Sequence, residues 1–237
     1  QRQMCIRDSY STLHQEMQPR SSLCGQSVSY TDVVYSGNLN LVMVVFKPVA
    51  ARVVLGIPMN NLRDKNVDVE LLGDASLIEL EKWIMETEDN NQCVYLIEQY
   101  LLKKLYGFTS ERFARMNAVV QSINNGQQDI TELSQSACLG YKQFKRVFAE
   151  YTGLNPKEFL QIARFRNALH CLHAGSQIRL NQLAYDWGYC DKSHLIKDFK
   201  TFMGYTPKEY LSICDSYSEY LSSVSYTHLT LPTTSRV

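Results

Sequence analysis

An eight-residue phrase occurs twice in this chain, and this repetition constrains the fold more than any other feature. GLNPKEFL begins at Gly153 and GYTPKEYL begins at Gly204, 51 positions further along. Each copy has the order of a helix start, in which a polar side chain caps free N–H groups, proline takes the first helical position and glutamate bonds back to the cap. Glycine suits the left-handed turn that ends the preceding helix. Each copy is therefore predicted to be a joint between two helices.

The similarity continues upstream of the phrase. FKRVFAEYTG aligns with LIKDFKTFMG at the same offset of 51, so that Phe148 corresponds to Phe199. LSQSACLGY pairs with LAYDWGYCD at an offset of 50, with one residue inserted in the second copy near Lys192. A unit of about fifty residues is thus present twice. Each unit is predicted to contain a short helix, a tight turn, a second helix, a glycine and a third helix.

The apolar residues of each second helix recur at helical spacing and predict a buried stripe. The first unit opens with Asp129-Ile-Thr-Glu132, which has the pattern of a capping box. The predicted stripes consist of Phe144, Val147, Phe148 and Tyr151 in the first unit and of Leu195, Phe199 and Phe202 in the second.

The opposite faces of the two second helices are basic and polar. A short helix, a tight turn and a second helix with an exposed basic start is the geometry of the DNA-binding helix-turn-helix, whose second helix enters the major groove. Lysine and arginine suit guanine edges and phosphates, and Gln143 suits adenine. For any one of these residues, a solvated helix face is the ordinary alternative. The residues predicted to contact DNA are Tyr141, Lys142, Gln143, Lys145, Arg146, Asp191, Lys192, Ser193, Ile196 and Lys197.

These residues resemble the AraC/XylS family of bacterial transcription regulators over about residues 110–214. The resemblance rests on DITELSQSACLGYKQFKRVFAEYTGLNPKEFLQIARFRNALHCL and IRLNQLAYDWGYCDKSHLIKDFKTFMGYTPKEYL. It implies a seven-helix double helix-turn-helix domain in which a linker helix, 155–174, holds the two units at a fixed spacing. It also implies sequence-specific DNA binding in two successive major grooves.

Two arginines of the linker helix are further candidate contacts, and two other residues depart from the family pattern. Arg164 and Arg166 lie on the linker helix and are candidate phosphate contacts, with a solvated helix face as the equal alternative. Arg179 stands where a small polar cap is expected, so its helix should start less firmly. Lys192 stands where similar sequences carry an uncharged polar residue, and we expect it to add phosphate affinity rather than base selection.

The first half of the chain predicts β structure followed by helices. Residues 28–47 have strand character, including the apolar run LNLVMVVF, and three helical patterns follow, with Asp74 as an N-cap and Gly107 as a stop. VVFKPVAARVVLGIPMNNLRDKNVDVE and the two helices after it resemble, more weakly, an N-terminal domain of one AraC subgroup. Such domains are cupin-like and serve effector sensing or dimerisation.

The expected fold class is mainly α. A C-terminal seven-helix double helix-turn-helix domain, 107–215, follows an incomplete, truncated α+β domain of cupin-like type, 10–106. Residues 1–9 and about 224–237 resemble translated adapter sequence, and the tail as a whole covers 216–237. We expect both ends to be non-native and the true N-terminal sequence to be absent.

Composition narrows the function classes. Residues 10–106 carry a net charge of −4 and residues 127–214 a net charge of +3, so an acidic partner would meet the second half. The seven cysteines are odd in number and form no Cys-x-x-Cys pair, which argues against a secreted disulfide framework and a zinc ribbon. The longest apolar run, Leu41 to Phe46, is far shorter than the ~20 residues of a membrane helix. We therefore expect a cytoplasmic protein that does not enter the membrane.

No catalytic motif, cofactor site or metal site is predicted. His170, Cys171 and His173 lie near one another on a helix, but a metal needs more ligands than this cluster offers. His194 is expected to pack or to contact phosphate. The expected partner is double-stranded DNA, and the family resemblance adds RNA polymerase, a small-molecule effector at the N-terminal domain and a second copy of the chain as further partners.

Two other functions remain open at this stage. The chain could act mainly through its N-terminal half as a ligand- or partner-binding protein with weak DNA affinity. It could also be an enzyme with a cupin-like metal site in the missing segment. Of the three functions, the sequence favours the DNA-binding transcriptional regulator.

Overall fold

A computed structural model of the chain describes residues 9–11, 16–30, 33–35, 42–174, 179–213 and 235–236. Over these residues the chain is mainly helical, which confirms the expected fold class. The α-helices are α1 (Ala50–Leu55), α2 (Ala75–Glu86), α3 (Asn90–Leu105), α4 (Glu111–Asn124), α5 (Ile130–Ser136), α6 (Tyr141–Thr152), α7 (Pro156–Ala174), α8 (Leu180–Asp186), α9 (Lys192–Met203) and α10 (Pro207–Ile213). Two short 3₁₀ helices are η1 (Met59–Leu62) and η2 (Val69–Leu72).

The strands are short and form two small sheets. One sheet has the order β2-β1-β4-β6, in which β1 is antiparallel to β2 and β4, and β4 is parallel to β6. In the other, β3 and β5 are antiparallel, with Leu23 opposite Val67. Across the described residues these sheets do not close into a barrel. The strands are β1 (Ser9–Ser11), β2 (Glu16–Gln18), β3 (Ser22–Cys24), β4 (Val33–Tyr35), β5 (Asn66–Asp68) and β6 (Ser235–Arg236).

The expected strand over the apolar run before Lys47 is wrong for residues 42–47. These residues have no regular secondary structure, and only Val33–Tyr35 of the predicted β region forms a strand among the described residues. A strand is stabilised by pairing with a neighbour, and no described strand pairs with residues 42–47. Met43 is accordingly exposed, and the chain turns at Pro48 into α1. Residues 36–41 lie outside the described part.

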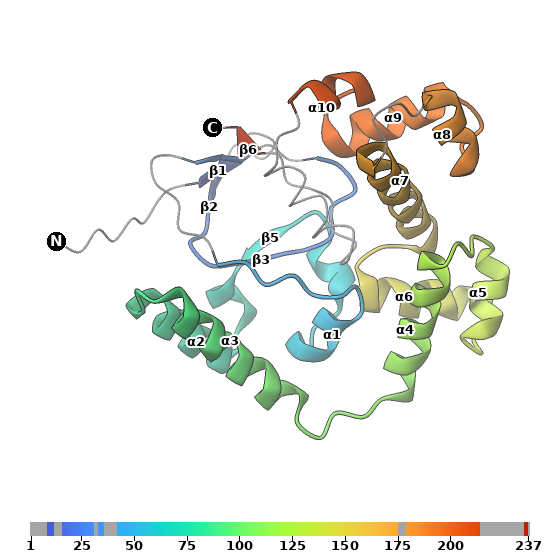
Figure 1. Cartoon of the computed structure of the whole chain (residues 1–237). Coiled ribbons are helices and arrows are strands. Elements are labelled where there is room, and N and C mark those ends of the chain that lie inside the picture. Colours follow the sequence, from blue (N-terminus) through green and yellow to red (C-terminus); the bar gives the residue numbers. More distant parts are fainter. Residues whose placement is uncertain are drawn as a thin grey trace.

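Helices α2 and α3 form a hairpin that is set apart from the C-terminal helices (Figure 1). Asp74 caps α2 as predicted, because its side chain accepts hydrogen bonds from the N–H groups of Ser76 and Leu77. The same carboxylate accepts a bond from Lys104 Nζ on α3 at 2.6 Å, which ties the two helices together. Helix α3 ends at Leu105, and Gly107, the predicted stop, has a positive φ of 69°. Residues 106–110 then lead to α4.

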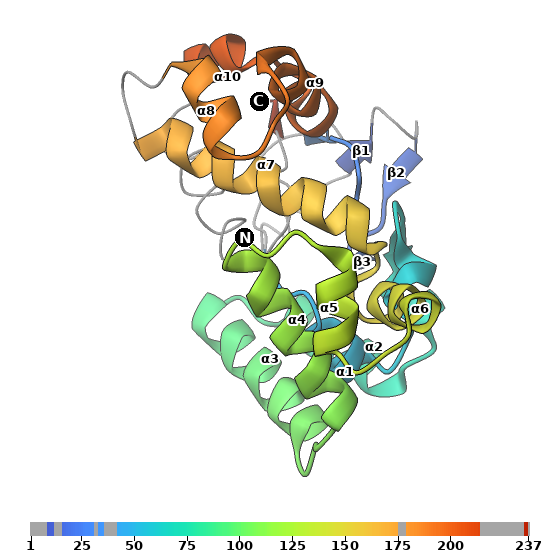
Figure 2. The same ribbon diagram turned by 90° about the vertical axis from the view of Figure 1, so that its right-hand side faces the viewer.

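Seven helices, α4 to α10, make up the C-terminal half, as the resemblance implies. Helix α7 packs against α4 and α6 and also against α8 and α9. Figure 2 shows α7 running between the two units, with α4, α5 and α6 on one side and α8, α9 and α10 on the other. The duplicated sequence therefore folds into two helical units on one connecting helix.

The predicted stripes are buried, and aromatic rings join them to α7. Phe148 of α6 meets Phe159 of α7 edge to face, with ring centroids 5.1 Å apart. Phe199 of α9 meets Phe165 of α7 in the same way at 4.9 Å. Such pairs contribute about 0.5–1.5 kcal/mol each beyond their buried area. All seven residues of the two stripes are buried: Phe144, Val147, Phe148, Tyr151, Leu195, Phe199 and Phe202.

Both copies of the repeated phrase are joints, as predicted. We call residues 153–158 the first joint and residues 204–209 the second joint. Gly153 and Gly204 end α6 and α9 with φ of 84° and 76°. In the first joint Asn155 caps the N–H of Glu158, whose carboxylate accepts the N–H of Asn155 in return. The same reciprocal pair of bonds joins residues 206 and 209 in the second joint.

The capping box predicted at the start of α5 forms only in part. Asp129 caps α5 through the N–H groups of Thr131 and Glu132. The carboxylate of Glu132 accepts a hydrogen bond from the side chain of Gln127 instead of bonding back to Asp129. The Asp129 N–H donates instead to the side-chain oxygen of Gln127. A residue outside the capping box thus provides the bond that Glu132 was expected to provide.

Among the described helices, none combines the length and the apolar character needed to cross a lipid bilayer.

We predict that Asp74→Asn destabilises the α2–α3 hairpin by about 1–2 kcal/mol at neutral pH, because it keeps the cap but removes the charge that pairs with Lys104. The hydrogen bond from Lys104, followed by that from Ser76, lowers the pKa of Asp74 to about 2. A folded-state pKa below the ordinary value means that the stabilisation is complete above about pH 4 and is lost as the pH falls toward 2.

Urea unfolding followed by Trp83 fluorescence in a Trp187→Phe background would measure this difference. Asp89→Asn is the matched control, because Asp89 caps α3 and has no ion-pair partner among the described residues. An equal loss of stability in both variants would contradict the assigned role of Lys104.

Candidate nucleic-acid interface

Helix α6 presents a polar face because its opposite face is buried. Gly140 precedes the helix as its N-cap, and Cys138 in the turn before it has a positive φ of 54°. The buried stripe fixes the rotation of the helix about its own axis, so that the predicted contact residues point to solvent. Those of α6 are all exposed: Tyr141, Lys142, Gln143, Lys145 and Arg146.

Helix α9 presents the corresponding face in the second unit. Asp191 is its N-cap and accepts the N–H of His194 at 2.8 Å, so its carboxylate serves the helix start. Of the remaining predicted residues, Lys192, Ser193 and Lys197 are exposed and Ile196 is half-buried. All ten residues predicted to contact DNA therefore lie on α6, on α9 or at the start of α9. Their contact with DNA stays a prediction.

The basic residues of these two helices are not used to hold the protein together. Over the described part of the chain, the lysines and arginines that form ion pairs include Arg52, Arg63, Lys104, Arg115 and Arg164. None of these belongs to α6 or α9. Lys145 lies over the ring of Tyr141, with Nζ 5.5 Å from the ring centre. Positive charge that has no carboxylate partner is available to phosphate.

A buried polar cluster fixes the position of α9 on α7. Asp198 of α9 is 2% exposed. Its carboxylate accepts a hydrogen bond from Gln161 Nε2 at 2.8 Å and lies 3.5 Å from Arg164 NH2, both on α7. The Arg164 guanidinium stacks 4.2 Å from the ring centre of Tyr189. Burial, and then the Asp198 charge, raise the pKa of the Tyr189 hydroxyl, which therefore stays neutral.

The two arginines of α7 that were candidates for phosphate contacts both make structural contacts, and for Arg164 the phosphate contact stays a prediction. Arg166 is only 8% exposed and donates a hydrogen bond to the Asn124 side chain of α4 at 3.1 Å, so the expected phosphate contact is wrong. Arg164 is held by Asp198 and Tyr189, as described above, and lies 3.5 Å from the Gly188 carbonyl and His194 Nε2. For Arg166 the alternative of a solvated helix face is also wrong, because this residue is buried. Neither arginine could be distinguished from a surface residue by helical spacing alone.

Among the other singled-out residues, His194 and His173 contact tyrosine side chains. The His194 ring packs edge to face on Tyr189 with centroids 5.1 Å apart, which agrees with the expected packing role. His173 shares a hydrogen bond with the Tyr210 hydroxyl at 3.0 Å, while His170 is exposed. Within the described residues no group of three potential ligands is placed to hold a metal ion. The helix that Arg179 precedes has no side-chain cap, as predicted.

Sequence reasoning missed the contacts between the two halves of the chain. Arg52 of α1 pairs with Glu150 of α6 at 3.1 Å. Arg63 makes two hydrogen bonds to the Glu158 carboxylate, at 2.6 and 3.0 Å. The partners are 98 and 95 positions apart, and no local pattern of a single sequence reports contacts over such distances.

Residues 133–213 match the family described as "Helix-turn-helix domain". Residues 2–68 match a second family, described as "Domain of unknown function (DUF6597)". The second match includes most of the segment 1–9, whose non-native origin stays a prediction. The first match begins within α5 and extends to the end of α10, so it includes both joints and both exposed faces.

Parts of the chain are similar to known proteins. An "Uncharacterized HTH-type transcriptional regulator" of Haemophilus influenzae is 25% identical over 135 residues, which cover 54% of this chain and 45% of that protein. The chain thus spans less than half the length of this curated relative. In the crystal structure of ToxT from Vibrio cholerae O395, the similar part is 16% identical in sequence and has a TM-score of 0.37. It covers 60% of this chain and 58% of the ToxT chain.

We predict that Asp198→Leu destabilises the protein by about 2–4 kcal/mol, because it leaves Arg164 without its partner. Replacing both partners, as in Arg164→Met with Asp198→Leu, should restore at least about 1 kcal/mol relative to the sum of the single changes. Urea unfolding of the unaltered chain, the two single variants and the double variant would measure the coupling free energy between the two side chains. Strictly additive effects would show that the two side chains do not hold α9 on α7.

Proposed function

We propose that the chain is a sequence-specific, DNA-binding transcriptional regulator of the AraC/XylS type, because residues 133–213 match a helix-turn-helix family and hold both duplicated units. Helices α6 and α9 would each enter a major groove of duplex DNA. The two grooves would be successive ones on the same face of the duplex. The proposal gives the chain a binding role and assigns no catalytic residue.

One observation carries this proposal: two duplicated units each expose the basic face of their second helix, and one helix joins them. Helix α7 has 19 residues. At a rise of about 1.5 Å per residue it is about 28 Å long, which is comparable to the ~34 Å between successive major grooves. A single chain would thereby present two reading helices, as a dimer of simple helix-turn-helix proteins does.

We assign roles by the chemistry of each side chain. Lys145 and Arg146, near the middle of α6, would bind guanine edges or phosphates, and Gln143 would bind adenine. On α9, Lys192 and Lys197 would bind phosphates. The further proposed contacts are Tyr141, Lys142, Asp191, Ser193 and Ile196.

Further partners follow from the proposed role. A transcriptional regulator acts on RNA polymerase, which we therefore propose as a second macromolecular partner. The N-terminal half, which packs on the DNA-binding half through the Arg52 and Arg63 ion pairs, is the proposed place for an effector or for a second copy of the chain.

We predict that Lys145→Ala combined with Arg146→Ala weakens binding to a duplex selected from random sequence by at least about tenfold, because each base or phosphate contact contributes about 1–3 kcal/mol. The slope of log affinity against log salt should also decrease by about 1–2. Fluorescence anisotropy at several salt concentrations would measure both quantities.

Lys82→Ala combined with Lys103→Ala is the matched control. Both lysines are exposed on the α2–α3 hairpin, and the control removes the same charge. If the two double variants bound equally well, the assigned reading helix would be wrong. If the unaltered chain preferred no sequence over random DNA, the proposed function itself would fail.

A further inference from the structure

Both joints of the duplicated units are bound by the same part of the N-terminal half. At the first joint, Gly153 lies against η1, where a Cβ on this glycine would be 3.3 Å from the Met59 carbonyl oxygen and 3.6 Å from Gln26 Cβ. The capping glutamate of this joint, Glu158, receives the two hydrogen bonds from Arg63 described above. The first joint therefore contacts residues 26, 59 and 63.

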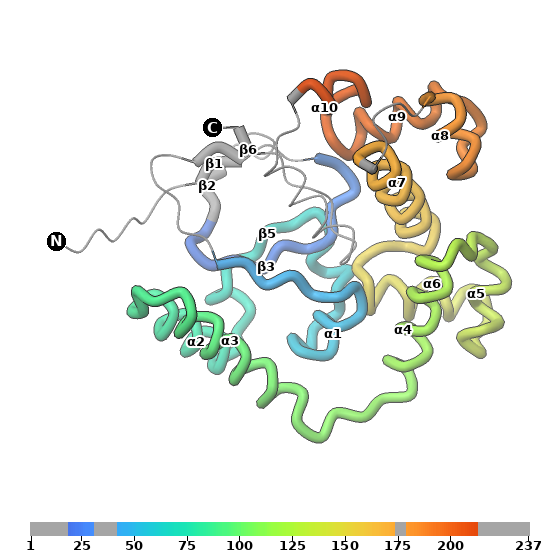
Figure 3. The backbone as a smooth tube through the Cα atoms, viewed as in Figure 1, coloured from blue at the N-terminus to red at the C-terminus, as the bar shows by residue number. Residues whose placement is uncertain are grey.

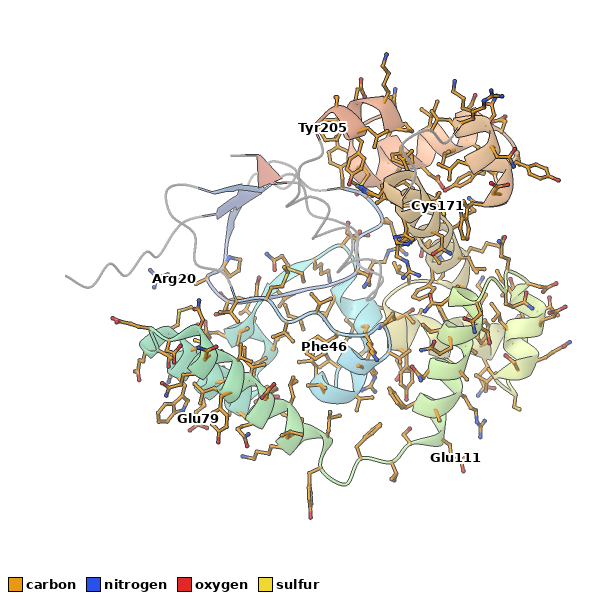
Figure 4. The ribbon with its side chains drawn as sticks, in the orientation of Figure 1. Arg20, Phe46, Glu79, Glu111, Cys171 and Tyr205 are labelled. Atoms are coloured by element: carbon orange, nitrogen blue, oxygen red, sulfur yellow. The ribbon has the colours of Figure 1, made fainter. Side chains whose placement is uncertain are left out.

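The second joint is bound by Tyr30. The Tyr30 N–H donates to the carbonyl oxygen of Thr201, in the last turn of α9, at 3.1 Å. The Tyr30 ring lies against Gly204, where a Cβ would be 3.0 to 3.2 Å from three ring carbons. Figure 4 shows Tyr205, the next residue, on the side of the second unit that faces the N-terminal half.

Backbone and side-chain bonds connect the two contacts to each other. Asp64, the neighbour of Arg63, donates its N–H to the Gln26 carbonyl oxygen and accepts the Val28 N–H on its carboxylate, both at 3.0 Å. Gly25 donates to the Lys65 carbonyl oxygen at 2.9 Å. We call residues 25–30 and 62–65 the brace. Figure 3 shows the blue trace that follows β3 passing from the level of β3 and β5 up toward the second unit.

The brace connects the two units a second time, in addition to the connection that α7 provides. A helix that joins two bodies leaves each of them some freedom to tilt about its end, because only packing resists the motion. When the same two units are also connected at a second place, they can no longer tilt freely about the ends of the helix. The Arg63–Glu158 pair is partly exposed and therefore contributes little to global stability. Its two-bond geometry nevertheless restricts direction, as bidentate arginine–carboxylate pairs do.

We propose that the brace sets the relative orientation of α6 and α9 and thereby selects the spacing between the two DNA half-sites. This inference rests on the proposed function. Tyr30 and Arg63 are then positioning residues for DNA recognition, although they do not touch DNA. The N-terminal half would affect operator choice through these two contacts.

The exposed cysteines of the two turns allow a test without DNA. Cys138 precedes α6 and Cys190 precedes α9, and both are exposed. Spin labels on these two residues, with Cys5, Cys24, Cys171 and Cys214 replaced by serine and the buried Cys93 left in place, would report the distance between the units in the full chain. Tyr30→Ala with Arg63→Ala should at least double the width of the distance distribution. Arg115→Ala with Tyr95→Ala, which removes an exposed arginine and an exposed tyrosine away from both joints, should leave it unchanged.

DNA binding gives the second readout. With the selected duplex and versions whose half-sites are one or two base pairs closer or further apart, the brace variant should lose at least tenfold affinity for the preferred spacing. It should bind each single half-site within about twofold of the unaltered chain. An unchanged distance width, or an equal loss on single half-sites, would overturn the proposed brace. Absence of sequence preference in the unaltered chain would instead overturn the proposed function, and the distance measurement would still decide on the brace.

Discussion

The C-terminal half depends on how its helices end and restart. At each joint a glycine with positive φ stops one helix, and a reciprocal pair of hydrogen bonds between residues three apart starts the next. These bonds satisfy N–H groups that a helix start otherwise leaves without partners. Because the geometry is local and the same in both copies, α6 and α9 leave their units in equivalent ways. The buried stripes fix the rotation of both helices, so the two helices also expose corresponding faces.

Helix α7 converts two equivalent units into one body. Edge-to-face contacts of Phe148 with Phe159 and of Phe165 with Phe199 lock α6 and α9 to different parts of the same helix. The second unit is also held on α7 by polar contacts, because the buried Asp198 bonds to Gln161 and pairs with Arg164. The position that corresponds to Asp198 in the first unit is Val147, which is buried in an apolar core. The duplicated units thus share their architecture but fix their exposed helices to α7 by different chemistry.

Features that depend on neighbours in sequence could be predicted, and features that depend on distant partners could not. The capping residues Asp74, Asn155 and Thr206 were predictable because a cap acts within three residues of itself. The buried stripes were predictable because helical spacing defines a face. The prediction of a strand in residues 42–47 was wrong because a strand needs a neighbouring strand to pair with, and local sequence does not specify that neighbour.

The arginines illustrate the same limit at the candidate interface. Arg146 and Arg166 both lie on helices, yet the first is exposed and the second is bonded to Asn124 of α4. Their helical positions alone gave no basis for separating these two roles. No sequence pattern indicated the role of Arg63, because its partner Glu158 lies 95 positions away. The candidate contact faces were therefore predictable, but the residues that hold those faces in place were not.

The central claim is that α6 and α9 read two successive major grooves on one face of the duplex. Methylation interference at guanine N7 on a selected duplex tests this claim most directly, because N7 lies in the major groove. The account predicts two clusters of interfering guanines about 10–10.5 base pairs apart, which places them on the same face. A single cluster, or two clusters about half a helical turn apart on opposite faces, would contradict it.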